Sequence, residues 1–279
     1  MITDRAERTL RILADREELT LTWFRYEPGE RGPDPHVHRQ HTDAFYVLEG
    51  ELEFGLGPDV TKMSGGAGTF AGAPPNVVHT FANESDATAI FLNIHAPSMG
   101  FGDMLRARRD GRKEDVERFD QFEPPADGGR PLDDAVIRGP ADADAVSLAG
   151  NTIAIKVSAA ETEGSLGLIA YTAAPEFPGP PPHIHRATND MFFVVQGTLT
   201  LRLGDDEHEA PPGSFALVPP GNVHTFANRQ REPVRFVSIV APGGFEQYFK
   251  DAAEASGDGP PDPRVLAEIA SRYDYEPVA

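Results

Sequence analysis

Short runs of apolar, β-branched and aromatic residues recur along this chain between turn residues, a pattern that predicts strands rather than helices. The two clearest runs are FYVLEGELEF, which begins at Phe45, and FFVVQGTLTLRL, which begins at Phe192. One glycine interrupts each run, Gly50 in the first and Gly197 in the second. Such a glycine predicts a turn or a bend between two strands.

A second pair of short apolar segments, TFAGA and SFALV, is bracketed by glycine and proline and also predicts strands. Asn76 and Gly221 occupy the same place just after these segments. Glycine adopts a positive φ at little cost, and asparagine is the next best residue for that role. We therefore expect a tight turn at both positions.

The remaining segments give weaker signals. The charged stretch 102–118 predicts a short surface helix, and 122–140, rich in proline, glycine and aspartate, is typical of a linker. Strands are expected again at 151–158 and 165–173. A helix is predicted over 263–273, because proline suits its first turn and an apolar stripe follows, formed by Val265, Leu266, Ile269 and Tyr273.

An internal repeat organises the whole chain. HVHRQHTDAFYVLEGELEFGLG begins at His36, and HIHRATNDMFFVVQGTLTLRLG begins 147 residues later at His183; the segment VHTFAN also occurs twice. A unit used twice at this separation indicates two copies of one domain, not a solenoid of short repeats. We place an N-terminal domain at 1–120 and a C-terminal domain at 146–279, joined by a linker at 121–145.

Composition excludes several classes of protein. The net charge of −19 disfavours binding to a nucleic acid backbone, because nothing neutralises phosphates in bulk. The absence of cysteine excludes disulfide scaffolds, cysteine-ligated zinc, iron–sulfur clusters and thiol nucleophiles. No stretch has the apolar length of a membrane span, and the first residues lack the apolar segment of a secretion signal. We therefore expect a cytoplasmic location and no membrane partner.

Each unit repeats a set of histidines and one aspartate that suits a metal ion. Two histidines separated by one residue point to the same face of a strand, and the aspartate and a later histidine can converge on them inside a barrel. Imidazole and carboxylate suit a divalent transition metal (Fe, Mn, Ni, Co, Cu or Zn), and four ligands leave positions open on a six-coordinate ion. We expect up to two ions per chain, held by His36, His38, Asp43 and His79 and by His183, His185, Asp190 and His224.

Four phenylalanines should face the same side of the strands as these ligands, by strand alternation. They are Phe45, Phe81, Phe192 and Phe226. Two interpretations stay open: an apolar pocket for a flat substrate, or simple filling of the barrel. The other histidines, His41, His95 and His208, are expected to be ordinary core or surface residues.

These motifs resemble those of the cupins, small jelly-roll barrels. One cupin motif is a glycine, a HxH pair, a carboxylate and a later glycine; the other is Gly-x5-Pro-x-Gly-x2-His-x3-Asn. The second unit matches every position of the latter motif, whereas the first has Asn76 in place of its second glycine. The resemblance implies an all-β protein with two jelly-roll barrels and short flanking helices. The complete motif makes the second barrel the better expected site.

Among two-barrel cupins, the chain looks most like bacterial quercetinase-type flavonol dioxygenases, on the strand signatures FYVLEG and FFVVQG and the similar segments HAPSMGFGDML and APGGFEQYF. That resemblance implies a small-molecule substrate and dioxygen, which opens the flavonol heterocycle with loss of carbon monoxide. It also implies that the carboxylate, here Asp43 or Asp190, is the base that takes the flavonol proton.

The family carboxylate is usually glutamate, and aspartate is one methylene shorter. Direct ligation by Asp43 and Asp190 therefore stays open, as does their role as a base. A small-molecule binding or sensing protein and a metal-dependent isomerase or cyclase remain alternatives. Monomer and homodimer are equally compatible with the sequence.

Overall fold

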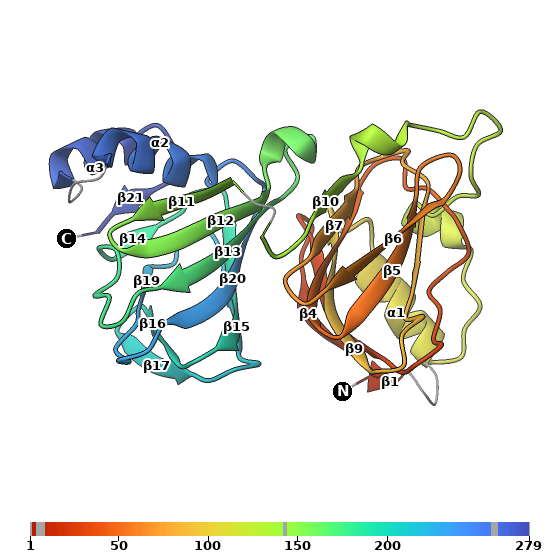
Figure 1. Ribbon diagram of the computed structural model, residues 1–279, viewed down its shortest axis with the longest axis horizontal. Helices are drawn as coiled ribbons and strands as arrows, with labels where there is room; N and C mark the ends of the chain where they lie inside the picture. Colours follow the sequence, from red (N-terminus) through yellow and green to blue (C-terminus); the bar gives the residue numbers. More distant parts are fainter. Residues whose placement is uncertain (1, 4–8, 142–143, 258–261, 279) are drawn as a thin grey trace. The chain divides into compact units, whose positions relative to one another are not determined.

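The computed structural model describes residues 2–3, 9–141, 144–257 and 262–278. The chain divides into two compact units, Met1–Asp142 and Ala143–Ala279 (Figure 1). Each unit consists mainly of antiparallel strands in two sheets, with short helices beside them. The prediction of an all-β protein with short flanking helices is confirmed.

The first unit contains a seven-stranded and a three-stranded sheet. The larger sheet has the order β1 (Ile2–Thr3), β2 (Thr9–Asp15), β3 (Thr20–Tyr26), β9 (Ala89–Ala96), β4 (Thr42–Glu49), β7 (Phe70–Ala73) and β10 (Val136–Arg138). The smaller sheet has the order β6 (Thr61–Gly66), β5 (Glu51–Leu56) and β8 (His79–Ala82).

The second unit contains a six-stranded and a five-stranded sheet. The larger has the order β11 (Asp144–Leu148), β12 (Asn151–Val157), β13 (Gly167–Ala173), β20 (Val234–Ala241), β15 (Asn189–Gln196) and β18 (Phe215–Val218). The smaller has the order β17 (Asp206–Ala210), β16 (Leu199–Leu203), β19 (His224–Ala227), β14 (His183–Ile184) and β21 (Glu276–Pro277). The order β2-β3-β9-β4-β7 thus recurs as β12-β13-β20-β15-β18, so the sequence repeat is a repeat of topology.

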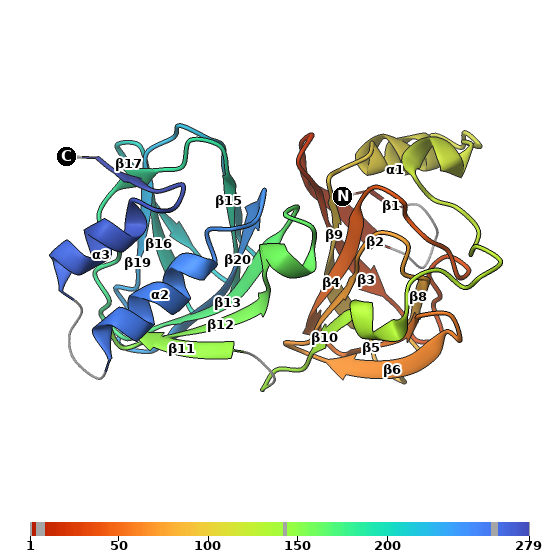
Figure 2. The same ribbon diagram turned by 90° about the horizontal axis from the view of Figure 1, so that it is seen from above.

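The α-helices follow β9 in the first unit and β20 in the second. In the first unit, α1 (Phe101–Arg109) is the short helix expected within 102–118, but it buries Met104 and Leu105 and so does not lie wholly on the surface. In the second unit, α2 (Gln247–Ser256), which the apolar pattern did not predict, packs against α3 (Pro263–Ala270) and β11 (Figure 2). Single turns of 3-10 helix are η1 (Val116–Phe119), η2 (Leu132–Asp134) and η3 (Ala159–Glu161).

The helix predicted at 263–273 ends earlier, at Ala270, and its apolar stripe is narrower than expected. Ile269 is buried and Leu266 packs against the core, whereas Val265 is 38% exposed. Across the described residues, none of the helices combines the length and the apolar run that crossing a bilayer requires.

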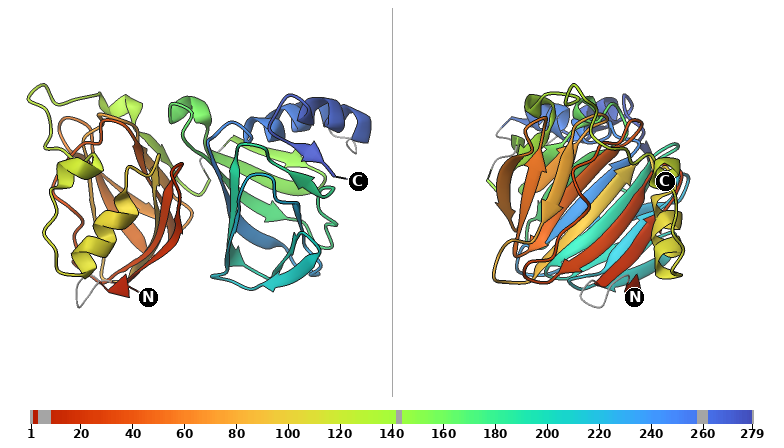
Figure 3. Two further views of the ribbon diagram at one scale, coloured as in Figure 1. Left: turned by 180° about the vertical axis from the view of Figure 1, so that it is seen from behind. Right: turned by 90° about the vertical axis from the view of Figure 1, so that its right-hand side faces the viewer.

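The segment expected as a linker, 121–145, is instead largely part of the first unit, and the division between the units falls at 142/143. Phe122 pairs with Val37, and β10 lies antiparallel to β7. Leu132 and Ile137 pack against the first core. Figure 3 shows the chain passing from α1 along the first unit to η2. Apolar residues scattered among the prolines and glycines of this segment pack against the first core. The prediction of a linker, which rested on composition alone, was therefore wrong for most of the segment.

The predicted turns are present. Gly50 (φ 72°) joins β4 to β5, and Gly197 (φ 77°) joins β15 to β16. Asn76 and Gly221 have φ values of 65° and 81°, which confirms the turn expected at both positions. The backbone N–H of Asn76 donates to the carbonyl of His38 (2.6 Å) and that of Gly221 to the carbonyl of His185 (2.7 Å). Both turns therefore hold the backbone of a candidate metal ligand.

We expect Asn76→Ala to lower the free energy of unfolding by about 1 kcal/mol, because an alanine Cβ is strained in the left-handed region. Asn76→Gly should stay within about 0.5 kcal/mol of the wild type, since glycine relieves that strain but adds entropy to the unfolded chain. Urea denaturation measures both. Gly221→Ala is the matched comparison: it places alanine at φ 81° with no neighbouring atom within 4 Å of the added Cβ, so it should lose a similar amount from backbone strain alone. Equal stability of Asn76→Ala and wild type would contradict the prediction.

Candidate metal centre

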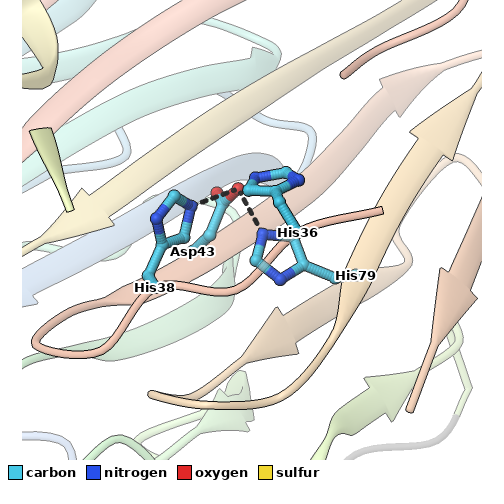
Figure 4. Close-up of side chains that lie close together, drawn as sticks. All are labelled: His36, His38, Asp43 and His79. Carbon is cyan, nitrogen blue, oxygen red and sulfur yellow. Dashed lines mark ion pairs between the residues drawn. The ribbon is translucent and has the colours of Figure 1, made fainter. Parts of the chain in front are cut away.

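The first cluster gathers side chains from three segments of the first unit. His36 and His38 lie before β4, Asp43 is in β4, and His79 begins β8. One Asp43 oxygen, Oδ2, lies 3.2 Å from Nε2 of His79 and 3.8 Å from Nε2 of His38 (Figure 4). All four side chains are buried, and their potential ligand atoms lie within 4.8 Å of one another. The structure thus brings together every residue of the first predicted ligand set.

The second cluster repeats this arrangement in the second unit. His183 in β14 pairs with His224 in β19, and the ligand atoms of His183, His185 and His224 lie within 4.8 Å of one another. Asp190 Oδ2 lies 3.3 Å from Nε2 of His224 and 3.9 Å from Nε2 of His185. Asp190 therefore lies beside two of the imidazoles from the same place in the repeated strand, but it falls outside the 4.8 Å group that the three histidines form, whereas Asp43 lies inside its own group.

Backbone carbonyls fix the orientation of all six imidazoles. Because a carbonyl only accepts hydrogen bonds, the ring nitrogen facing it must carry the proton, which leaves the other nitrogen free as a ligand. In four rings Nδ1 donates to the carbonyl two residues earlier: His36 to Asp34, His79 to Val77, His183 to Pro181 and His224 to Asn222. His38 and His185 instead donate to the distant residues Asp120 and Asp274.

Several of the Nε2 atoms are buried and available as metal ligands. Within the described part of the chain, Nε2 of His38, His79 and His185 is buried and has no hydrogen-bond partner. A buried polar atom without a partner costs about 1–3 kcal/mol. Three imidazole nitrogens facing one carboxylate are donors that suit a divalent transition metal, so the residues fit such an ion in both units.

Burial lowers the pKa of candidate imidazole ligands in both units. It lowers the pKa of His36 well below the usual value, with His79 and His38 adding to the shift, and lowers that of His183 to about 3, helped by His224. Burial would raise the pKa of Asp43, but the imidazoles of His95, His38 and His79 outweigh it and hold that pKa well below its usual range. Neutral imidazoles around an ionised carboxylate are the protonation states that bind a metal.

The two carboxylates differ in their further partners. Asn93 in β9 donates from Nδ2 to Asp43 Oδ1 at 2.5 Å, whereas Ser238, the matching residue of β20, donates from Oγ to Asp190 Oδ1 at 3.3 Å. His95 Nε2 also lies 3.6 Å from Asp43 Oδ1. The first carboxylate is therefore held more firmly than the second.

His41 and His95, expected to be ordinary core or surface residues, form a buried chain behind the first cluster. The His41 ring lies 2.8 Å from Asp120 Oδ2 through Nδ1 and 2.8 Å from His95 Nδ1 through Nε2. The second unit has Thr188 and Val240 at the matching positions, so this chain belongs to the first unit. His208, by contrast, is exposed in β17, as expected of a surface residue.

The phenylalanines have different surroundings in the two units. Phe192 and Phe226 line a cavity of about 360 Å³ that also contains His183 and Asp190. Further walls come from aromatic residues of several elements, including Tyr171, Phe236, Phe245, Tyr248 and Tyr275. Phe45 and Phe81 instead pack against each other, with ring centroids 4.6 Å apart, inside the first core.

The cavity near His36 is of another kind. It is larger, about 820 Å³, and charged side chains such as Arg39, Arg108, Asp115 and Glu117 line it. Matching phenylalanines in the sequence thus line a cavity in one unit and fill the barrel in the other.

Asp120 and Asp274 are site residues that the sequence analysis missed, although a signal was present. They lie in FDQFEP and YDYEP, two similar segments that follow the helices of each unit. Their spacing differs from that of the barrel motifs, so they fell outside the repeat as it was first aligned.

Comparisons with known proteins agree with this geometry. The family model described as the cupin domain matches residues 22–95 and 171–240. Quercetin 2,3-dioxygenase of Bacillus subtilis (strain 168) is 28% identical over 68 residues, which are 24% of this chain and 20% of that protein. The alignment therefore spans only a fifth of that relative's length.

Two solved structures share the fold. Protein Ylba from E. coli has a TM-score of 0.61 at 10% identity, with 86% of this chain and 85% of that chain covered. Bacillus subtilis oxalate decarboxylase, in a study of its Mn(II) centres, has a TM-score of 0.58 at 14% identity, with 85% and 73% covered.

Acidification should destabilise the metal-free protein. Burial lowers the pKa of His36, His95, His183 and His38, the last to about 4, so the unfolded chain binds more protons below pH 6.5. The contribution of these histidines to the free energy of unfolding is then fully present above about pH 6.5. It falls towards pH 4 by about 1.4 kcal/mol per pH unit for each such histidine. The pKa of His224 is raised by Asp190 despite burial and offsets part of this loss.

Urea midpoints of chelator-treated protein at pH 7 and pH 5 measure this effect. His183→Gln should flatten the pH dependence, whereas His208→Gln, at an exposed position, should leave it unchanged. A midpoint that is constant or rises on acidification would show that these imidazoles are not buried in neutral form.

Proposed function

Since this chain belongs to the cupin family and carries two cupin domains, we propose that it is a metal-dependent dioxygenase acting on a flavonol-like or other phenolic, enolisable small molecule. The observation that supports this most directly lies in the second unit. There, His183 and Asp190 open onto a cavity walled by aromatic rings. A flat molecule in that cavity contacts the candidate metal ligands themselves.

The cavity suits a flat, mainly apolar substrate. Its volume of about 360 Å³ falls in the range of small-molecule pockets, which are mostly apolar with a few polar groups that fix orientation. Phe226 and Phe236, with ring centroids 5.1 Å apart, offer aromatic surface, while His183 and Asp190 supply the polar end. A phenolic ring system with its oxygens directed at the imidazoles satisfies both kinds of surface.

The chain's own residues would hold the reactants and move one proton. A bound divalent ion supplies open positions for substrate oxygens and dioxygen. The Nε2 atoms of His183, His185 and His224 hold that ion, each oriented by a carbonyl at Nδ1. Asp190, which lies beside His224 and His185, would accept the proton of the phenolic hydroxyl, and the aromatic walls would exclude water from the site.

A non-oxidative cupin function is the alternative. The charged cavity beside His36 and the packed phenylalanines of the first core favour it for the first unit. A binding or sensing role would give tight ligand binding without product. An isomerase or cyclase would form product without oxygen uptake.

His183→Ala and His224→Ala should each remove one equivalent of metal per chain, because each deletes one of three imidazoles that meet at one point. Elemental analysis of purified protein measures the loss. His208→Ala is the control, since that side chain is exposed and remote from both ligand sets. Unchanged metal content in both ligand variants would overturn the metal assignment in the second unit.

Asp190→Asn should lower oxygen consumption with a phenolic substrate by about 100-fold or more, since the amide cannot accept the substrate proton. Its metal content should fall less than that of His224→Ala. An oxygen electrode, run on each metal-loaded form with quercetin and simpler phenols, measures the rate. Asp43→Asn tests the other unit: an equal loss there would move the reaction to the first site. Oxygen uptake by no loaded form would contradict the proposed activity.

A further inference from the structure

A segment beyond the second barrel returns to strand β14, which carries the candidate ligand His183. Strand β21 pairs with β14, with His183 opposite Pro277 and Ile184 opposite Glu276. Beyond it, the N–H of Val278 donates to the carbonyl of Pro182 at 2.8 Å. A short stretch of chain far from the barrel in sequence thus becomes a neighbour of the HxH pair.

Asp274, just before β21, binds the loop that follows this pair. Its carboxylate accepts backbone N–H bonds from Arg186 (2.6 Å), Ala187 (2.9 Å) and Thr188 (2.8 Å). Its backbone carbonyl accepts the Nδ1 proton of His185. One residue therefore fixes both the ring of a candidate ligand and the loop leading from that ligand to Asp190.

Asp120 makes closely matching contacts in the first unit, with the His41 ring in the place of the third backbone N–H group. Its Oδ2 accepts N–H bonds from Arg39 (3.1 Å) and Gln40 (2.7 Å), and its carbonyl accepts the Nδ1 proton of His38 at 2.7 Å. Two residues later, Phe122 exchanges two backbone hydrogen bonds with Val37, the residue between the histidines. Ile184 has the same relation to Glu276 in the second unit.

The two contacts are equivalent although they lie outside the barrel repeat. Asp120 and Asp274 are 154 residues apart, as are Phe122 and Glu276, whereas the HxH pairs are 147 apart. The side chains around them differ: Arg39 stacks on Phe122, while Arg186 forms an ion pair with Glu276. Only the aspartate and the backbone pairing are kept in both units, which points to a shared role at the ligand loop.

We propose that Asp120 and Asp274 are positioning residues for the two metal sites, each tying the HxH loop from a segment beyond the barrel. The proposal rests on the metal binding proposed above. Consecutive backbone N–H groups gathered on one carboxylate fix the loop, and the carbonyl keeps the proton on Nδ1 so that Nε2 faces the ion. Loss of the carboxylate frees the loop between His185 and Asp190 and weakens the hold on the ion.

Asp274→Ala should weaken Co²⁺ binding at the second site by about 10–100-fold, as loss of outer partners of metal ligands does. The titration is performed in a His79→Ala background, so that the second site binds the probe alone. Calorimetry gives the affinity, and the visible spectrum of the Co²⁺ complex reports the ligand geometry. Asp274→Asn, whose amide oxygen still accepts one or two N–H bonds, should recover part of both.

Glu276→Gln is the matched control. It removes the exposed ion pair with Arg186 but keeps the backbone pairing of β21, so affinity and spectrum should match those of the parent. In the reciprocal His224→Ala background, Asp120→Asn should weaken Co²⁺ binding at the first site. If Asp274→Ala fails to fold, Asp274→Asn still decides the question.

The outcomes separate the two proposals. Unchanged affinity and spectrum in Asp274→Ala, or in Asp274→Asn where the alanine variant does not fold, would overturn the positioning role while leaving metal binding intact. If neither the His79→Ala protein nor the His224→Ala protein binds Co²⁺, the proposed metal function itself would be overturned. An equal spectral change in Glu276→Gln would assign the effect to β21 as a whole rather than to the aspartate.

Discussion

The backbone pairing between the first histidine of each HxH pair and the later histidine is the constraint on which both sites depend. His36 and His79 exchange two backbone hydrogen bonds, and His183 pairs with His224 in the same way. Directly opposed residues of an antiparallel pair project to the same face, so the rings must meet. Their centroids lie 4.3 Å apart in both units. Strand register thus brings two imidazoles together, and the carboxylate and the carbonyls at Nδ1 add further contacts to that pair.

The same donor set stands in two different environments. Asp43 has Asn93 and the chain of His95 and His41 behind it, whereas Asp190 has Ser238 and a cavity in front of it. A carboxylate enclosed by firm partners is well placed to hold an ion, and one beside a cavity is well placed to meet a substrate. The two units thus share the candidate ligands and differ in what surrounds them.

Local patterns predicted what depends on neighbours in sequence. Alternation and the interrupting glycines gave the paired strands, and the order Pro-Asn or Pro-Gly gave the turns at Asn76 and Gly221, because turn conformation is set by the residues within it. The two ligand sets could be predicted because the same residues recur at the same spacing in both units, even without knowledge of the fold. What local patterns could not give are partners far away in the chain. The Asp120 carboxylate contacts the His41 ring although the two residues are 79 positions apart in the chain. Strand β10 likewise forms by pairing with β7, which is distant in sequence.

The Nε2 atoms without partners give a physical reason for the contacts that surround each histidine cluster, namely the carbonyls at Nδ1, the tight turns and the tied loops. Rings whose Nδ1 protons are committed to carbonyls cannot turn to bond one another, so three buried Nε2 atoms have no partner among the residues that the structure describes. That arrangement is unfavourable by itself, and only the surrounding register, turns and tied loops hold it in place. A divalent ion held at these atoms would satisfy them, and its binding energy would then be coupled to folding. The rigidity of the barrel is therefore the means by which the chain keeps open a site that its own side chains cannot satisfy.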